Sequence, residues 1–290
     1  MKVWNRVGIL LVAGMMLLSG CVSADTGSQG AAEDKSSQQE ASVTSSEDPS
    51  SEEESSASES SSSKEESPVS EEPSQSETSE QPVSGPVEAS FYDDAVFIGD
   101  SVSLRLYYYC QSHPEALGKA QFLTAGSMGS GNALQEVTED SVHPSYQGTK
   151  MSLEDGVKAS GAKKVFIMLG MNDLNIYKID GTVKNMDTLA QRILEKSPDA
   201  EIYFQSMTPI LAGHEKGLLT NENLDQYNAK LKELAKEKGY HFADVASVMK
   251  KDDGSLKSEY CSDSEGMGMH FTDAGAEAWI DYLLQNAASF

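Results

Sequence analysis

The sequence is poor in positive charge. Its 290 residues carry 22 Lys and Arg against 46 Asp and Glu, which gives a net charge of −24. Proteins that bind nucleic acid do so largely through clustered Lys and Arg, so this balance excludes a nucleic-acid partner. Apolar residues are also scarce for a fully globular chain, at 38%. This composition indicates that part of the chain does not form a packed core.

A hydrophobic run long enough to span a bilayer is also missing from the sequence. The apolar run from Val7 to Leu18 is about a dozen residues long, whereas a helix across the ~30 Å hydrocarbon core needs about twenty. Its length and the basic residues before it predict a signal peptide over residues 1–21. The run ends in Leu18-Ser19-Gly20-Cys21, which resembles the lipobox of bacterial lipoproteins. That resemblance implies a lipidated Cys21 and a membrane anchor facing the extracytoplasmic side. The alternative is an ordinary cleaved signal with an unrelated cysteine.

Residues 22–90 lack aromatic side chains altogether. They include 23 serines, 17 acidic residues and 2 basic residues, a net charge of −15. Such a segment cannot bury enough apolar surface to offset its conformational entropy, so we expect a disordered tether. A flexible chain of this length spans about 45 Å. The tether would hold the following domain away from the membrane, although a partner-binding or modified tail is an alternative.

Residues 91–290 contain every aromatic residue except Trp4 and carry a net charge of −11. Short apolar runs alternate with helical patterns along this region. The pattern predicts strands over 95–98, 121–123, 164–169, 201–207 and 241–243, and helices over 101–110, 153–159, 183–196, 224–238 and 272–285. Thr272 is a candidate N-cap of the last helix. Because the strands are continuously apolar, we expect an α/β domain with a central parallel sheet covered by helices on both faces.

Polar residues stand where the predicted strands end, which is where ligands bind in open α/β sheets. Ser101 begins the helix after the first strand, Asn172 follows the strand that ends at residue 169, and a glycine-rich run occupies residues 126–131. Of the five histidines, His270 alone precedes a C-terminal helix that could return it to the strand ends. Each feature also has a structural interpretation: a helix cap for Ser101, a turn for Asn172 and a flexible loop for the glycines.

In combination, these residues resemble the SGNH (GDSL-type) serine hydrolases. Gly99-Asp100-Ser101 resembles the first sequence block of the family, Gly129 (or Gly126) the second, Gly170-Met171-Asn172-Asp173 the third, and His270 the last. The resemblance covers residues 91–290 and implies a flavodoxin-like three-layer α/β/α fold. It also implies an esterase in which Ser101 is the nucleophile and His270 the general base. The Ser101 N–H, the Gly129 N–H and the Asn172 amide would form the oxyanion hole.

The sequence departs from the family at the acid that orients the histidine. The family pattern is Asp-x-x-His, but Met267 stands three residues before His270. Asp263 is the first candidate for this acid and Glu265 the second. A Ser–His pair without an acid, and a catalytically inactive cell-wall or carbohydrate-binding lipoprotein on the same fold, also remain open.

Cysteine is scarce as well, since Cys110 and Cys261 are all that remain after Cys21. They could form a disulfide in an exported protein or stay buried as free thiols. No metal-ligand cluster stands in the sequence, and the implied mechanism needs no cofactor.

We expect the substrate to be an ester on a neutral acetylated glycan, because a domain of charge −11 repels strongly anionic substrates. The family also contains lipases, lysophospholipases and thioesterases. The sequence does not indicate an oligomeric state.

Overall fold

The computed structural model describes residues 85–290. Cys21, the expected signal peptide over 1–21 and all but the last six residues of the expected tether therefore lie outside the described residues. Within the described part, no helix is long and apolar enough to cross a membrane. The fold begins before the expected boundary at position 91, because the short helix η1 spans Ala89–Tyr92 and the Val87 N–H donates to the Leu284 carbonyl.

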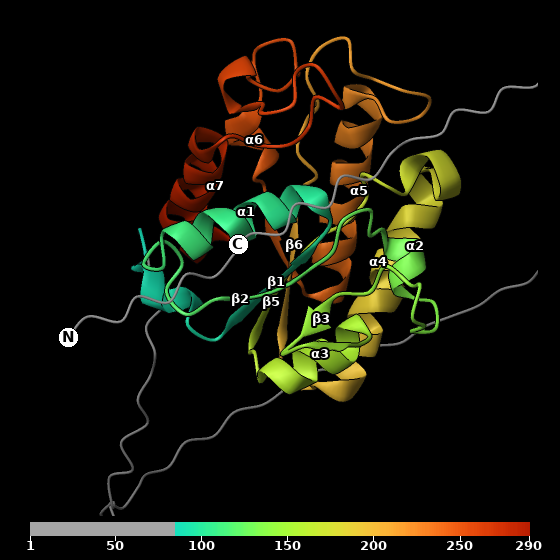
Figure 1. Cartoon of the computed structure of the whole chain (residues 1–290), viewed down its shortest axis with the longest axis vertical. Helices are drawn as coiled ribbons and strands as arrows, with labels where there is room; N and C mark the ends of the chain where they lie inside the picture. The colour runs from blue at the N-terminus through green and yellow to red at the C-terminus, as the bar shows by residue number, and fades with distance from the viewer. Residues whose placement is uncertain (1–84) are drawn as a thin grey trace, which may run out of the picture. The chain divides into compact units, whose positions relative to one another are not determined.

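A sheet of five parallel strands, in the order β2-β1-β5-β6-β7, forms the centre of the domain (Figure 1). All residues of β1, and all but the first of β5, are buried. This burial explains their continuous apolar sequence, because helices cover both faces of the sheet. The strands are β1 Ala95–Gly99, β2 Gln121–Thr124, β5 Lys164–Met168, β6 Glu201–Gln205 and β7 His241–Ala243.

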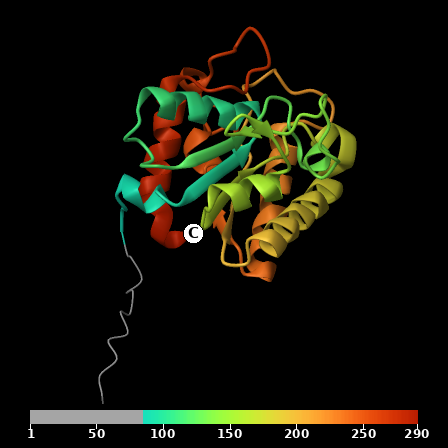
Figure 2. The same cartoon turned by 60° about the horizontal axis from the view of Figure 1, so that its bottom comes forward.

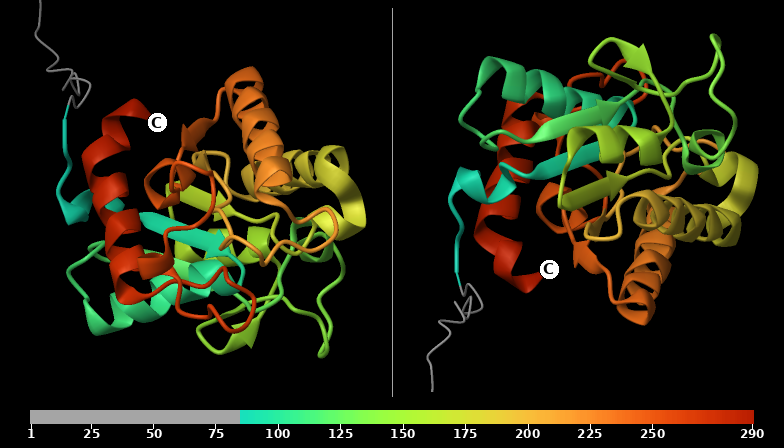
Figure 3. Two further views of the ribbon diagram at one scale, coloured as in Figure 1. Left: turned by 90° about the horizontal axis from the view of Figure 1, so that it is seen from above. Right: turned by 90° about the horizontal axis from the view of Figure 1, so that it is seen from below.

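Two layers of helices enclose the sheet (Figures 2 and 3). Helices α3, α4 and α5 pack in a row on one face, and α1 packs with α7 on the other. This arrangement confirms the flavodoxin-like α/β/α architecture. The helices are α1 Ser101–Ser112, α2 Ser130–Ala133, α3 Leu153–Ser160, α4 Leu174–Lys196, α5 Asn221–Lys238, α6 Ala246–Met249 and α7 Asp273–Asn286, with the short turns η2 Ser258–Tyr260 and η3 Ala287–Ser289.

Helix α4 differs most from its prediction, because it begins at Leu174 rather than near residue 183. Its first turn is separated from the rest by Lys178, whose φ of 57° and ψ of 179° are not helical. The break interrupts the 3.6-residue period, so only the second part carries a clear apolar face. The short helix α2 and the hairpin of β3 Ser145–Tyr146 with β4 Thr149–Lys150 were not predicted either. Each is too short to show a period. Thr272 caps α7 as expected, since its side chain accepts from the Gly275 N–H.

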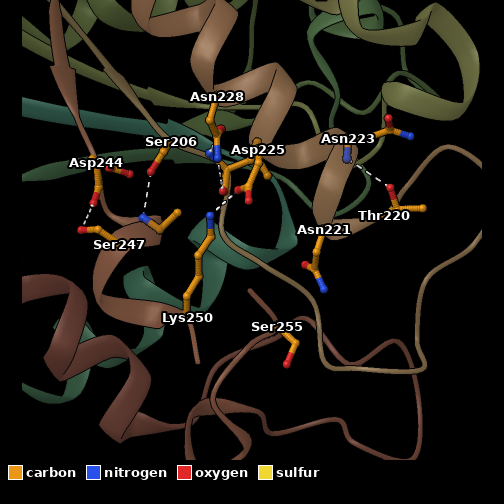
Figure 4. Close-up of polar contacts among 12 residues, drawn as sticks. Ser206, Thr220, Asn221, Asn223, Asp225, Asn228, Asp244, Ser247, Lys250 and Ser255 are labelled. Carbon is orange, nitrogen blue, oxygen red and sulfur yellow. Dashed lines mark hydrogen bonds and ion pairs between the residues drawn. The ribbon is translucent and has the colours of Figure 1, made fainter. Parts of the chain in front are cut away.

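Strand β6 ends at Gln205, two residues earlier than predicted. The Met207 N–H and carbonyl instead pair with the side-chain amide of Asn228 on α5, at 2.7 and 2.8 Å. The adjacent Ser206 Oγ accepts from the Ala246 N–H at the start of α6 at 2.8 Å (Figure 4). These contacts anchor the end of β6 to two helices, and the Ser206 N–H donates to the Ala243 carbonyl of β7 at 3.0 Å. The buried N–H groups of Ser206 and Met207 and the Met207 carbonyl are thereby paired.

The order in which the parallel strands are added to the sheet changes side between β1 and β5. From β1 it passes to β2 at one edge, and the later strands follow on the other side of β1. Gly99 at the end of β1 pairs with Met168 at the end of β5. In open parallel sheets, the crevice at the carboxyl ends of two such strands is the usual ligand site. The residues that follow β1 and β5 are therefore the first candidates for the active site.

Candidate active site

Ser101 is the first residue of α1, directly after β1. The buried Asp100 is the N-cap, and its Oδ1 accepts from the Val102 N–H at 2.9 Å. Gly99 has no room for a side chain, because a Cβ there would lie 2.0 Å from Ser103 Oγ and 2.9 Å from the Met168 carbonyl oxygen. The strand can thus turn tightly into the helix and leave Ser101 at the strand end, in the positive potential of the helix N-terminus.

His270 joins Ser101 to an acid. His270 Nε2 lies 2.9 Å from Ser101 Oγ, and His270 Nδ1 lies 2.7 Å from Asp263 Oδ2. With Asp263 as acceptor, Nδ1 carries the proton and Nε2 is free to accept from the serine hydroxyl. The side chains of His270 and Asp263 are 19% and 24% exposed, so both are largely shielded from water.

The loop that contains Asp263 is closed by its own hydrogen bonds. Asp263 Oδ1 accepts from the backbone N–H groups of Met269 and His270, both at 3.0 Å, and the Ser262 N–H donates to the His270 carbonyl at 2.8 Å. Gly268 allows the return, with a φ of 69°. The loop therefore brings an acid seven residues before the histidine into the place that the family pattern gives to an acid three residues before it. Glu265 is exposed, and Asp263 is the acid that contacts the imidazole.

Two carboxyl groups near Ser101 have shifted pKa values of opposite sign. Burial raises the pKa of Asp263, but hydrogen bonds from the His270 side chain and backbone outweigh it and leave that pKa below the ordinary value. Asp100 is fully buried, and desolvation raises its pKa from 3.8 to about 7; the Asp173 charge adds to this rise, while the Val102 N–H and His270 oppose it. Asp263 is thus a stable anion, and Asp100 changes charge near neutral pH.

Asn172 and Gly129, the expected oxyanion donors, lie on loops that meet beside Ser101. Asn172 Nδ2 donates to the Met128 carbonyl at 3.1 Å and to Asp100 Oδ2 at 3.3 Å, and so links the glycine-rich loop to the start of α1. The Gly129 N–H donates to Asn132 Oδ1 at 2.7 Å. Both donors therefore have acceptors within the protein, and a substrate oxyanion would have to compete with them. Catalytic hydrogen bonds of this kind are often formed only once the substrate is bound.

Asp173 is a site residue to which the sequence assigned no role of its own. It is buried, and its two oxygens accept from the Ser130 and Gly131 N–H groups at 2.7 and 3.1 Å. Burial raises its pKa, although these two backbone bonds oppose the rise. Asp173 therefore fixes the start of α2, and with it Gly129, to the loop that carries Asn172. Because the two segments lie 42 residues apart or more, no local sequence pattern could have revealed this contact.

The described residues contain neither a disulfide nor a metal-type cluster. Cys110 and Cys261 are buried free thiols, and burial raises the pKa of Cys110 to about 11. Cys261 Sγ lies 3.5 Å from Asp263 Oδ1, so it touches the acid loop. Among residues 85–290, no group of His, Cys, Asp and Glu side chains has the arrangement of a metal site.

The family comparison agrees with this geometry. Residues 152–278 match the model of the GDSL-like lipase/acylhydrolase family. Over this range, which is less than half of the chain, the sequence resembles that family. The matched range includes Asn172, Asp263 and His270, and the structure adds Ser101 and Gly129 from outside it. The domain over residues 85–290, which we call the GDSL-type domain after this match, is accordingly an enzyme that hydrolyses ester bonds. No curated protein matches the chain at a significant level.

Solved structures resemble the GDSL-type domain in fold. A protein of Streptococcus pneumonia named for platelet activating factor is 21% identical, with a TM-score of 0.50, over 67% of this chain and 88% of that one. A GDSL-like lipase from Bacteroides thetaiotaomicron is 18% identical, with a TM-score of 0.48, over 70% and 89%. An acetyl-xylooligosaccharide esterase from Geobacillus Stearmophilus is 18% identical, with a TM-score of 0.45, over 68% and 94%. The first of these likenesses supports the shared three-layer fold.

Proposed function

We propose that the protein is a lipid-anchored serine esterase, held through Cys21 on the extracytoplasmic side of the membrane, that removes O-acetyl groups from neutral glycans. The observation that carries the proposal is the continuous contact from Ser101 Oγ through His270 to Asp263, at 2.9 and 2.7 Å. A serine hydroxyl is a weak nucleophile until a base removes its proton, and this arrangement supplies the base and the group that orients it.

The reaction follows from the positions of these groups. Ser101 Oγ attacks the ester carbonyl carbon while its proton passes to His270 Nε2, and Asp263 stabilises the resulting imidazolium. The tetrahedral oxyanion takes its hydrogen bonds from donors at the strand ends, including the Asn172 amide. His270 then gives its proton to the leaving alcohol oxygen, which leaves an acyl group on Ser101. Water attacks this acyl-enzyme with His270 as base and releases the carboxylic acid.

Charge supports a neutral substrate. The region 91–290 carries 29 acidic and 18 basic residues, and this net charge of −11 repels anionic polymers. A lipid anchor followed by the acidic tether would hold the domain near the cell surface, where acetylated polysaccharides are available. We therefore propose an ester substrate with two features, a short acyl group and a neutral alcohol.

Labelling with a fluorophosphonate probe tests the chemistry, and product analysis tests the substrate. We expect the wild type to be labelled and to release acetate from acetylated glycans faster than it hydrolyses long-chain lipid esters. Ser101→Ala and His270→Ala should lose both activities. A wild type that neither reacts with the probe nor hydrolyses any acetyl ester would instead indicate a binding protein on this fold. Faster hydrolysis of the lipid esters would place the enzyme among the lipases. Incorporation of labelled palmitate that disappears in Cys21→Ser tests the anchor.

A further inference from the structure

Exposed apolar side chains gather on segments that are tied to the active site. Among residues 85–290, the large hydrophobic side chains on the surface are Ile176, Tyr177, Leu218, Met267 and Tyr108. The first four, which we call the apolar rim, are 69%, 36%, 41% and 50% exposed. Exposed apolar groups that cluster, rather than lie singly, commonly mark a binding surface.

One part of the rim follows the oxyanion residue Asn172. Ile176 and Tyr177 lie in the first turn of α4, and the unusual backbone at Lys178 ends this turn. A backbone conformation of this kind costs free energy and persists where the surrounding structure requires it. The Tyr177 ring lies against α2, because a Cβ on Gly131 would come within 2.1 Å of it. The Tyr177 side chain therefore lies beside the glycine-rich loop, and Ile176 precedes it in the same exposed turn.

The loop over residues 211–220 adds Leu218 to this surface. Asn175, in the same first turn of α4, accepts from the Leu218 N–H at 2.7 Å and donates to the Lys216 carbonyl at 3.2 Å. Gly217 between them has a φ of 63° and leaves room for the Asn175 side chain, since a Cβ there would lie 2.4 Å from Asn175 Oδ1. The Leu218 backbone is thus fixed to Asn175, the residue before Ile176, while the Leu218 side chain remains exposed.

The same loop reaches the segment that carries the catalytic acid and base. The Leu211 N–H donates to the Gly268 carbonyl at 2.7 Å, and His214 Nδ1 lies 3.2 Å from the Gly266 carbonyl oxygen. Met267 stands between these two glycines and is exposed. Figure 2 shows the loop after β6 (orange) and the loop before α7 (red) side by side at the top of the domain. The apolar rim therefore extends from the oxyanion side of the site to the side of the base.

We propose that the apolar rim binds the sugar rings of the glycan that carries the ester, an inference that rests on the proposed function. A pyranose ring has an apolar face of C–H groups and a hydroxyl edge, so it can cover exposed apolar side chains while its hydroxyls stay in water. A fatty acyl chain has no polar edge and gains most from an enclosed channel. Side chains that are one-third to two-thirds exposed form an open surface instead, which suits an extended polymer.

The test compares a polymer with a small ester in the full chain. The rim variants are Ile176→Ser, Leu218→Ser and Met267→Ser, and the matched control is Tyr108→Ser, because Tyr108 on α1 is as exposed as Met267, at 50%. The substrates are acetylated xylan oligosaccharides, p-nitrophenyl acetate and p-nitrophenyl laurate, and thermal unfolding monitors the fold. We expect each rim variant to lower the ratio of kcat/KM on the glycan to that on p-nitrophenyl acetate about fivefold, through KM. The Tyr108→Ser ratio should equal that of the wild type.

Several results would overturn the inference. One is an unchanged ratio in all three rim variants, and another is an equal fall in Tyr108→Ser. A selective loss of laurate hydrolysis would assign the rim to the acyl chain instead. A wild type that hydrolyses p-nitrophenyl acetate but not the glycan would also refute the inference, while the serine esterase itself would stand. Absence of hydrolysis of every ester would refute the proposed function, and the two failures are therefore distinguishable.

Discussion

Replacement of Asp263 by asparagine tests the assignment of the catalytic acid most directly. The new side-chain amide would keep an oxygen for the Met269 and His270 N–H groups, which Asp263 Oδ1 now accepts at 3.0 Å, so the loop should remain closed. Its NH₂ group would then face His270 Nδ1, where the carboxylate now lies at 2.7 Å. Two donors cannot share this contact, so His270 would turn to the tautomer with its proton on Nε2. In that form it cannot accept the proton of Ser101.

The expected loss of activity is large. In a Ser–His–Asp triad, the same substitution lowers kcat by about 10⁴ with the geometry intact. The Asp263 side chain is 24% exposed, which lets water compensate part of the lost charge, so we expect a fall of about 10³ to 10⁴ in kcat/KM on p-nitrophenyl acetate. The midpoint of thermal unfolding, measured on the same samples, should change far less than the activity.

Glu265→Gln is the matched control, because it removes the same charge from the same loop. Glu265 is exposed, and the imidazole contacts Asp263 instead. We expect this variant to keep its activity within about twofold, as is usual for a surface substitution. The reasoning fails if Asp263→Asn retains more than a tenth of the wild-type activity, or if both variants lose activity equally. The first result would favour a Ser–His pair, and the second a loop in which both acids act.

Three further predictions concern stability. Burial raises the pKa of Asp100 in the folded protein from 3.8 to about 7, so the folded state binds this proton more tightly than the unfolded chain does. The stability that this group contributes is fully present below pH 3.8 and is lost as the pH rises to 7. Between those values the wild type should lose up to about 4 kcal/mol of unfolding free energy from this group, and Asp100→Asn should abolish that slope in urea titrations at pH 4 and pH 8; parallel curves for both proteins would contradict the burial argument. Gly99→Ala should destabilise the domain by about 3 kcal/mol, because its Cβ would lie 2.0 Å from Ser103 Oγ, and an unchanged melting temperature would show that the turn has room. Lys178→Gly should raise the unfolding free energy by about 1 kcal/mol, since glycine adopts its φ of 57° without strain; a loss of stability would mean that the Lys178 side chain contributes more than the strain costs.

Much of the fold follows from local sequence patterns. The runs that became β1 and β5 are apolar at consecutive positions because both sides of each strand are buried, and such runs predict a covered parallel sheet without reference to any distant contact. Thr272 followed by a helical pattern identifies the start of α7 in the same way. The first part of α4 escaped prediction because a single residue, Lys178, interrupts its period. Helix α2 is only four residues long and is held by Asp173 from a distant segment.

In the candidate site, too, some residues could be predicted from the sequence and others only from the folded structure. Ser101, Asn172 and His270 could be recognised in the sequence because they stand near strand ends or before the last helix and, in combination, resemble the sequence blocks of the SGNH hydrolases. The choice between Asp263 and Glu265 could not be made there, since two acids two residues apart in a glycine-containing loop are equivalent until the path of the loop is known. The hydrogen bonds from the Met269 and His270 N–H groups to Asp263 Oδ1 decide that path.

The sequence by itself determined the α/β class of the domain, because composition and periodicity are properties of neighbouring residues, and its resemblance to the SGNH hydrolases pointed to the residues of the site. Tertiary structure alone decided which acid meets His270, that Asp173 holds the start of α2, and that Leu218 and Met267 lie on one loop network with Ile176. Most of these contacts join residues far apart in the chain. Their geometry depends on how the strands and helices pack, and packing is set by the whole domain rather than by any local run of residues.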